Sequence, residues 1–218
     1  MKVTQEQPII VLVGSFNPAI FHPAWFARHG LLPEDEANAA RIDLVHPELT
    51  QFTAEWLSVQ VSQSRLQLAT ALTPQELPLR DVAVGILRLL SHTPISAIGI
   101  NRIVSVELDS ETDWIRVNDA LAPKSPWADL LPSPTMAGVT MESPRGDTLP
   151  GRVTVRVSAA PEIPFGVRLN LNSHVDHPDG DTDALRLAGV LEGHYKRIQD
   201  DAKAFLPNLL EHALGVRA

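Results

Sequence analysis

The most regular alternation of hydrophobic and polar residues lies between Ile98 and Leu108, near the middle of the chain. There every second residue is apolar except for one arginine: Ile98, Ile100, Arg102, Val104, Val106 and Leu108. A period of two is typical of a β-strand that buries one face. Because the run is long, rich in β-branched residues and flanked by other strand-like segments, it predicts a central strand with Ile100 and Val104 almost fully buried.

Further strand patterns come earlier in the chain. Ile9–Val13 is apolar at every position, which is typical of a strand buried on both faces. Residues 49–61 alternate as well, but the apolar parity changes at Trp56 and Leu57. We interpret this change as a β-bulge that bends one long strand, and we expect a hairpin turn at residues 62–64.

Two cleaner alternations follow in the second half. In residues 151–158 and 165–173, valine, leucine and phenylalanine alternate with arginine, threonine and asparagine. Each pattern predicts a strand with one face in solvent, as antiparallel strands often have. The segment 111–134 is the least regular part of the chain, with prolines that bound loops around one short helix at 113–121.

Helical periodicity predicts the remaining elements. Residues 22–30 predict a short helical segment that Gly30 ends. A capping box at residues 73–76, with Pro74 at the first helical position, introduces an amphipathic helix that runs to Leu90. The longest apolar stripe predicts a C-terminal helix from residue 182 or 183 to about residue 206, capped by Asp181 or Thr182 and kinked or ended by Pro207.

The order of these elements predicts the fold class. Strands followed by a helix and a strand, and then strands followed by a long helix, are typical of an α+β fold. We expect a largely antiparallel sheet with amphipathic helices packed on one face. The length of 218 residues fits a single domain, 1–218. Because the halves 1–108 and 109–218 each combine strands with a packed helix, a pseudo-duplication stays an open alternative.

Charge and cysteine content narrow the function classes. The chain has 18 Lys and Arg against 26 Asp and Glu, a formal charge of −8, and no basic run, so nucleic-acid binding is not expected. The absence of cysteine excludes disulfides, thiolate metal sites and a cysteine nucleophile. The apolar run Ile9–Val13 is too short for a signal peptide, and no apolar run reaches the length of a membrane span. We therefore expect a cytoplasmic location, no membrane partner and no cofactor.

One short motif on the predicted central strand resembles a known family. Gly99-Ile100-Asn101-Arg102-Ile103 is similar to a glycine followed by an Ile-Asn-Arg-Ile run in a sporadically distributed, uncharacterised bacterial family of β-rich α+β chains. The order of elements is similar as well, from the N-terminal apolar strand to the C-terminal amphipathic helix. The resemblance implies a fold and no particular activity.

A second motif follows the first strand. Ile10–Pro18, read as Ile-Val-Leu-Val-Gly-Ser-Phe-Asn-Pro, resembles the first strand and phosphate loop of nicotinamide and nicotinate mononucleotide adenylyltransferases. The resemblance implies that Gly14, Ser15 and Phe16 approach phosphates, with Asn17 in the same turn, and that His22 stabilises the leaving pyrophosphate.

The sequence departs from that family in two places. His22 is followed by Pro23-Ala24-Trp25 where the family has a Gly-His pair, and the later Ser-Ser/Thr-x-x-Arg signature is absent. The family has a parallel sheet, whereas residues 49–72 predict a hairpin. The alternative interpretation is a Gly-Asn-Pro turn that ends a buried strand.

The densest group of metal-ligating side chains lies between the last predicted strand and the C-terminal helix. His174, His177 and either Asp176 or Asp179 would offer imidazole and carboxylate ligands to a divalent cation. Their spacing matches no zinc or calcium motif, so the alternative is a solvated turn whose polar residues cap the following helix.

Arg102 is the one charged residue on the apolar parity of the central strand. It predicts an anion-binding residue in a cleft, an arginine paired internally with a carboxylate, or an arginine that a bulge at Asn101 turns outward. Three further arginines, Arg152, Arg156 and Arg168, would share the polar side of two strands and attract an acidic partner, or stay solvated.

No catalytic residue is assigned from the sequence. Several of the large aromatic residues lie in irregular segments, which favours contact with proteins because such side chains often anchor interfaces; the residues are Trp25, Phe26, Trp56, Trp114 and Trp127. We therefore expect a non-enzymatic interaction or assembly module that binds a protein partner or associates with itself. The alternative is an adenylyltransferase-like enzyme that binds a nucleotide at Gly14–Pro18.

Overall fold

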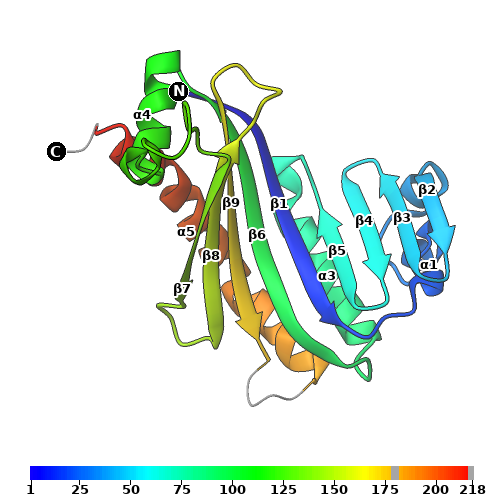
Figure 1. Cartoon of the computed structure of the whole chain (residues 1–218). Helices are drawn as coiled ribbons and strands as arrows, with labels where there is room; N and C mark the ends of the chain where they lie inside the picture. Colours follow the sequence, from blue (N-terminus) through cyan, green and yellow to red (C-terminus); the bar gives the residue numbers. More distant parts are fainter. Residues whose placement is uncertain (178–181, 216–218) are drawn as a thin grey trace.

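Two strands of thirteen residues, β1 (Lys2–Gly14) and β6 (Ile95–Glu107), run antiparallel to one another through the middle of the sheet. They are the longest strands in the computed structural model, which describes residues 1–177 and 182–215 (Figure 1). Their pairing extends from Lys2 opposite Glu107 to Gly14 opposite Ile95. The alternating segment read from the sequence is therefore half of the central strand pair.

The described residues form one sheet in the order β2-β3-β4-β5-β1-β6-β9-β8-β7, and each pairing in it is antiparallel. The remaining strands are β2 (Arg41–His46), β3 (Leu49–Ala54), β4 (Leu57–Ser62), β5 (Arg65–Ala69), β7 (Gly138–Pro144), β8 (Gly151–Ala159) and β9 (Gly166–Asp176). The expected α+β class with an antiparallel sheet is confirmed.

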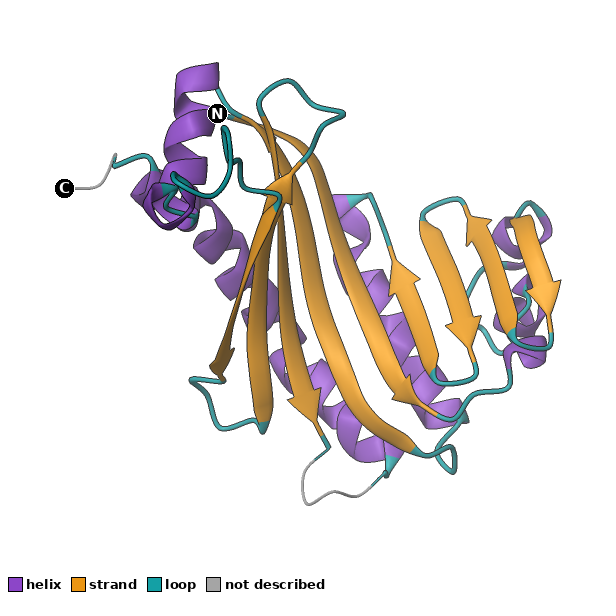
Figure 2. Ribbon diagram, in the orientation of Figure 1, coloured by secondary structure: helices purple, strands orange, loops and turns teal. Residues whose placement is uncertain are grey.

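Two long helices lie together behind the sheet (Figure 2). The helices are α1 (Pro23–Arg28), α2 (Glu34–Asn38), α3 (Glu76–Leu89), α4 (Glu111–Leu121) and α5 (Ala184–Ala213). Of these, α3 and α5 pack against each other and against the central strands. No helix in the described ranges combines the length and the apolar character needed to cross a membrane.

The period of two in β6 explains where the core lies. Ile98 and Ile100 share a buried cluster with α3 and α5, while Val104 and Val106 join a second cluster with the end of α5. Ile100 and Val104 are 1% and 7% exposed, so the predicted burial of both is confirmed.

The predicted β-bulge at Trp56 is wrong. Residues 49–61 form two strands, β3 and β4, joined by a tight turn at Glu55 and Trp56, with Glu55 at a positive φ of 23°. A two-residue turn reverses the chain and also shifts the parity of the apolar positions, so it leaves the same trace in the sequence as a bulge.

Both predicted helix starts also need correction. Glu76 makes no capping hydrogen bond, because its carboxylate turns inward to Arg102. The cap of α5 is Asp183, whose side chain accepts from the backbone N–H of Leu185 at 2.9 Å, whereas Asp181 lies outside the described residues. The helix does not end at Pro207 either, since α5 continues through it to Ala213, while a kink at Pro207 stays a prediction.

Candidate functional site

The Gly14–Phe16 backbone, predicted to approach phosphates, is used within the fold. The N–H groups of Gly14, Ser15 and Phe16 donate at 3.1, 3.0 and 2.8 Å to the carbonyls of Ser64, Pro94 and Gln63. A Cβ atom on Gly14 would lie 2.3 Å from a neighbouring carbonyl oxygen, so glycine is required here by close backbone packing. The backbone N–H groups that would bind a phosphate are therefore already hydrogen-bonded to neighbouring loops.

Asn17 and His22 both act as local caps. The Asn17 side chain accepts from the N–H of Ala19 at 3.2 Å, and His22 Nδ1 accepts from the N–H of Trp25 at 3.2 Å. The sheet that follows is antiparallel, unlike the parallel sheet of the adenylyltransferases. These contacts fit the alternative interpretation, a turn that ends a strand.

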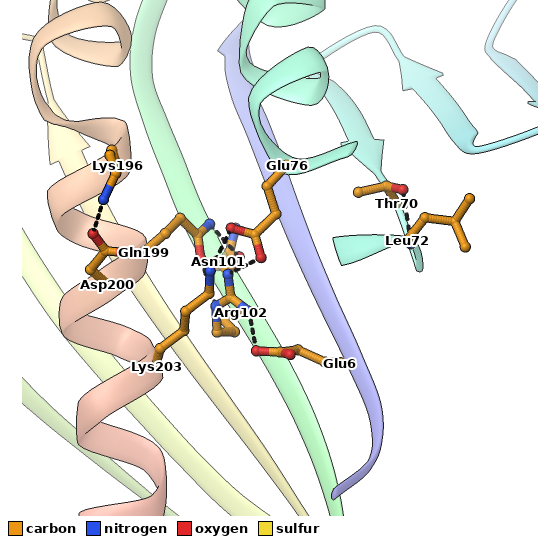
Figure 3. A network of polar contacts seen from close by, with 10 residues as sticks. All are labelled: Glu6, Thr70, Leu72, Glu76, Asn101, Arg102, Lys196, Gln199, Asp200 and Lys203. Atoms are coloured by element: carbon orange, nitrogen blue, oxygen red, sulfur yellow. Dashed lines mark hydrogen bonds and ion pairs between the residues drawn. The ribbon is translucent and has the colours of Figure 1, made fainter. Parts of the chain in front are cut away.

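Arg102 is fully buried within a polar cluster between β6, β1, α3 and α5 (Figure 3). Its guanidinium donates to the carboxylate of Glu76 at 2.7 Å and to the side-chain oxygen of Gln199 at 2.8 Å, and it forms an ion pair with Glu6. Lys203 forms a second ion pair with Glu76 at 2.9 Å. Two cations thus meet two carboxylates, and the charges balance.

The cluster is closed by further contacts from α5. The amide of Gln199 donates to the backbone carbonyl of Asn101 at 3.2 Å. Burial, together with the negative charge of Glu76, raises the pKa of Tyr195 above its ordinary value, so its hydroxyl stays protonated at neutral pH. Because its charges are matched and Arg102 is fully buried, the cluster is a structural link between α5 and the central strands.

The candidate metal ligands do not all come together. His174 Nε2 lies 3.0 Å from Asp176 Oδ1, whereas His177 Nε2 lies 3.1 Å from the backbone oxygen of Asp183 at the start of α5. Residues 1–177 and 182–215 contain no group of three His, Asp or Glu side chains placed to hold a metal ion. Asp179 lies outside the described residues.

Arg152, Arg156 and Arg168 do share a face of β8 and β9, as their spacing predicts. In the register of the sheet Arg156 lies opposite Asn170, and Arg168 lies opposite Ser158. Arg152 is paired with Glu142 at 3.1 Å, and Arg168 is paired with Glu162. This face is therefore polar, with two of its three arginines already neutralised.

Most of the aromatic residues expected at an interface pack inside. Trp25 meets Phe21 at a tilt, Phe26 meets Phe52 edge to face, and Trp56 donates from Nε1 to Glu36 at 3.0 Å. Trp114 is half-buried. Trp127 alone among the four tryptophans, all in described residues, is more than half exposed, at 51%.

The strand at one end of the sheet, β7, was not predicted from the sequence. β7 pairs with β8 over seven consecutive positions without a register shift, and its other edge meets no strand in the described chain. All its residues except Val139 are exposed, with Met141 at 67%. The only sequence signal was the alternation of Val139 and Met141 with Thr140 and Glu142, which is too short to stand out.

A second missed feature is a cavity of about 330 Å³ beside α5. Its polar wall holds Arg145, Asp147 and Arg197, and Ser173 lies behind them. The carboxylate of Asp147 forms ion pairs with Arg145 and with Arg197, each at 2.7 Å. These contacts, above all the hydrogen bond from Arg145, hold the pKa of the Asp147 carboxyl well below its usual range. Arg145 and Asp147 lie in a loop, and Arg197 follows 50 positions later, so spacing could not have joined them.

Comparison with known proteins adds no assignment to this geometry. The two family expectations, drawn from Gly99–Ile103 and from Ile10–Pro18, therefore stay predictions. No protein-family model matches this chain, and no curated protein matches it in sequence.

Proposed function

We propose that this protein is a non-enzymatic assembly module that associates with a second copy of itself through the outer edge of β7. The observation that carries the proposal is a regular seven-residue edge strand whose side chains are exposed and whose outer backbone edge has no partner in the described chain. Unpaired N–H and C=O groups along such an edge form a template for another strand.

The opposite edge of the sheet, strand β2, carries features that hinder pairing with another strand, so β7 is the better candidate for self-association. β2 carries exposed Ile42, Leu44 and Val45, but a register shift between Ile42 and Leu44 interrupts its pairing with β3. The Arg41–Asp43 ion pair, at 2.9 Å, places charge on the same strand. Bulges and charged side chains are the features by which natural proteins prevent pairing at an edge.

The side chains of β7 suit pairing with a copy of the same strand. In an antiparallel pair centred on Met141, the two Met141 side chains face each other, and Thr140 lies opposite Glu142 of the other copy. No like charges are then directly opposite. Glu142 is also neutralised within its own chain by Arg152 at 3.1 Å.

Apolar side chains beside the edge add surface for association. Val139, Val153 and Val155 are only partly buried, and all three pack at the margin of the second core cluster. They share the face of β7 and β8 that carries Met141. A second copy paired at β7 would remove this surface from water.

We also retain as proposals three further predictions from the sequence: the placement of the helices, a duplication of the two halves and the location in the cell. We infer that the helices stand on one face of the sheet, supported by the joint packing of α3 and α5. A duplication of the halves 1–108 and 109–218 and a cytoplasmic location are retained as proposals. Nothing at Gly14–Pro18 favours the nucleotide-binding alternative.

The test is the mass of the protein in solution, measured by sedimentation across a range of concentrations. We expect a dimer that Met141→Lys converts to a monomer, because two ammonium groups would face each other at the centre of the pair. Met141→Leu should keep the dimer, and Val45→Lys on β2 is the matched control that should also keep it. A wild-type chain that stays monomeric at its highest soluble concentration contradicts the proposal, as does a dimer that Val45→Lys disrupts and Met141→Lys does not.

A further inference from the structure

The cavity beside α5 combines one charged wall with an apolar one. It lies between the β7–β8 loop, strands β8 and β9, and the second half of α5, which crosses behind these strands in Figure 1. Its volume of about 330 Å³ is at the small end of the usual range for ligand pockets. A site of this size suits a small molecule rather than a folded partner.

One side of the charged wall is fixed by the fold. Arg145 is 4% exposed and holds both oxygens of Asp147, at 2.8 Å from Nε and 2.7 Å from Nη2. Its remaining terminal nitrogen donates to the hydroxyl of Ser173. Since the pKa of Asp147 is held low, the carboxylate stays ionised, and Arg145 with Asp147 forms a neutral, rigid pair.

The other side of the wall is available. Arg197 is 49% exposed, and its hydrogen bonds all come from Nη2, to Asp147 at 2.7 Å and to His194 at 3.4 Å. Its Nε and Nη1 groups make no hydrogen bond to the described residues. Because Arg145 already neutralises Asp147, the charge of Arg197 is not fully matched there, and its Nε and Nη1 groups, which point in different directions, can each donate a single hydrogen bond to a carboxylate oxygen.

The apolar wall and one acidic residue complete the site. Val153 and Leu171 form part of the lining, and Phe205 also faces it while remaining 44% exposed. Asp201 lies at the same cavity one turn beyond Arg197 on α5 and is exposed. The negative charge of Asp201 would repel a bound anion, so its removal should strengthen the binding of an anion.

We propose that this cavity binds a small carboxylate with a short apolar body, its carboxylate on Arg197 and its hydrocarbon against Leu171 and Phe205. The inference does not depend on the assembly through β7, since Arg197, Leu171 and Phe205 lie outside the surface assigned to that assembly, and only Val153 is common to both. Such a ligand is recognised by one charged side chain that fixes its carboxylate and by apolar surface that is removed from water when the ligand binds.

Hexanoate is the probe, with 1-hexanol and hexylamine as matched compounds that lack the carboxylate. Binding is followed by amide and methyl NMR shifts of the full chain. We expect saturable shifts at Leu171 and Val153 with hexanoate, and affinity lower by about ten-fold or more for the alcohol and the amine.

Single substitutions at the cavity test whether Arg197 holds the carboxylate. Arg197→Ala should weaken hexanoate by about ten-fold or more, whereas Asp201→Asn should strengthen it by removing a repulsive charge. Arg88→Ala is the matched control, since Arg88 is an exposed arginine paired with Glu192 at 2.6 Å outside the cavity. Equal binding of hexanoate and hexanol, or full affinity in Arg197→Ala with its fold verified by the same spectra, overturns the proposal.

Discussion

Helix α5 takes part in two arginine–carboxylate clusters that differ mainly in their exposure. In one, Arg102 and Glu76 are buried between the helix and the central strands, while Glu6 and Lys203 are partly exposed, and two cations match two carboxylates. The other, around Asp147, opens onto a cavity and matches two arginines to one carboxylate. Similar pairing chemistry therefore has different consequences: burial makes the first costly to break, and exposure leaves the second with charge for a ligand.

The largest effect is expected when Arg102 is removed from the first cluster. Arg102→Met leaves the carboxylate of Glu76 buried with Lys203 as its remaining partner, and should lower the free energy of unfolding by about 3–5 kcal/mol in urea titrations. The double variant Arg102→Met with Glu76→Leu removes both charges and should recover most of that loss. If Arg102→Met lowers the free energy of unfolding by less than about 1 kcal/mol, burial does not make this cluster more costly to break than the exposed one.

Within the open cluster, the two arginines should divide between stability and binding. Arg145→Ala should cost about 1–3 kcal/mol, because Asp147 and Ser173 lose a nearly buried donor. Arg197→Ala should cost less than about 1 kcal/mol, as half-exposed ion pairs generally contribute little. Urea unfolding of both variants checks this order, and the reverse order would place the structural role on Arg197.

The smallest effect concerns pH. The pKa of Asp147 is depressed in the folded chain, so its ion pairs contribute stability above the unfolded pKa of about 3.9 and lose it as pH falls through the folded value. The difference in unfolding free energy between wild type and Asp147→Asn should thus be constant from about pH 8 to 5 and shrink below about pH 4. A difference that persists undiminished at about pH 3 would contradict the depressed pKa.

Local patterns in the sequence could predict the elements that bury one face. Alternation in residues 98–108 indicated a central strand, and the apolar stripe after residue 183 indicated the long helix, because each depends only on the repeat of its own backbone. The same patterns could not separate a bulge from a tight turn at Glu55, since both shift the parity of the apolar residues.

The sequence by itself determined the fold class, the core of β6 and the presence of a charge at position 102. Only the tertiary structure decided what that charge does, because its partners Glu6, Glu76 and Gln199 come from three other elements. The cavity likewise joins a loop, two strands and a helix. Side chains far apart in the chain meet only once the strand order is set, and the sheet register that sets it depends on contacts summed over the whole molecule.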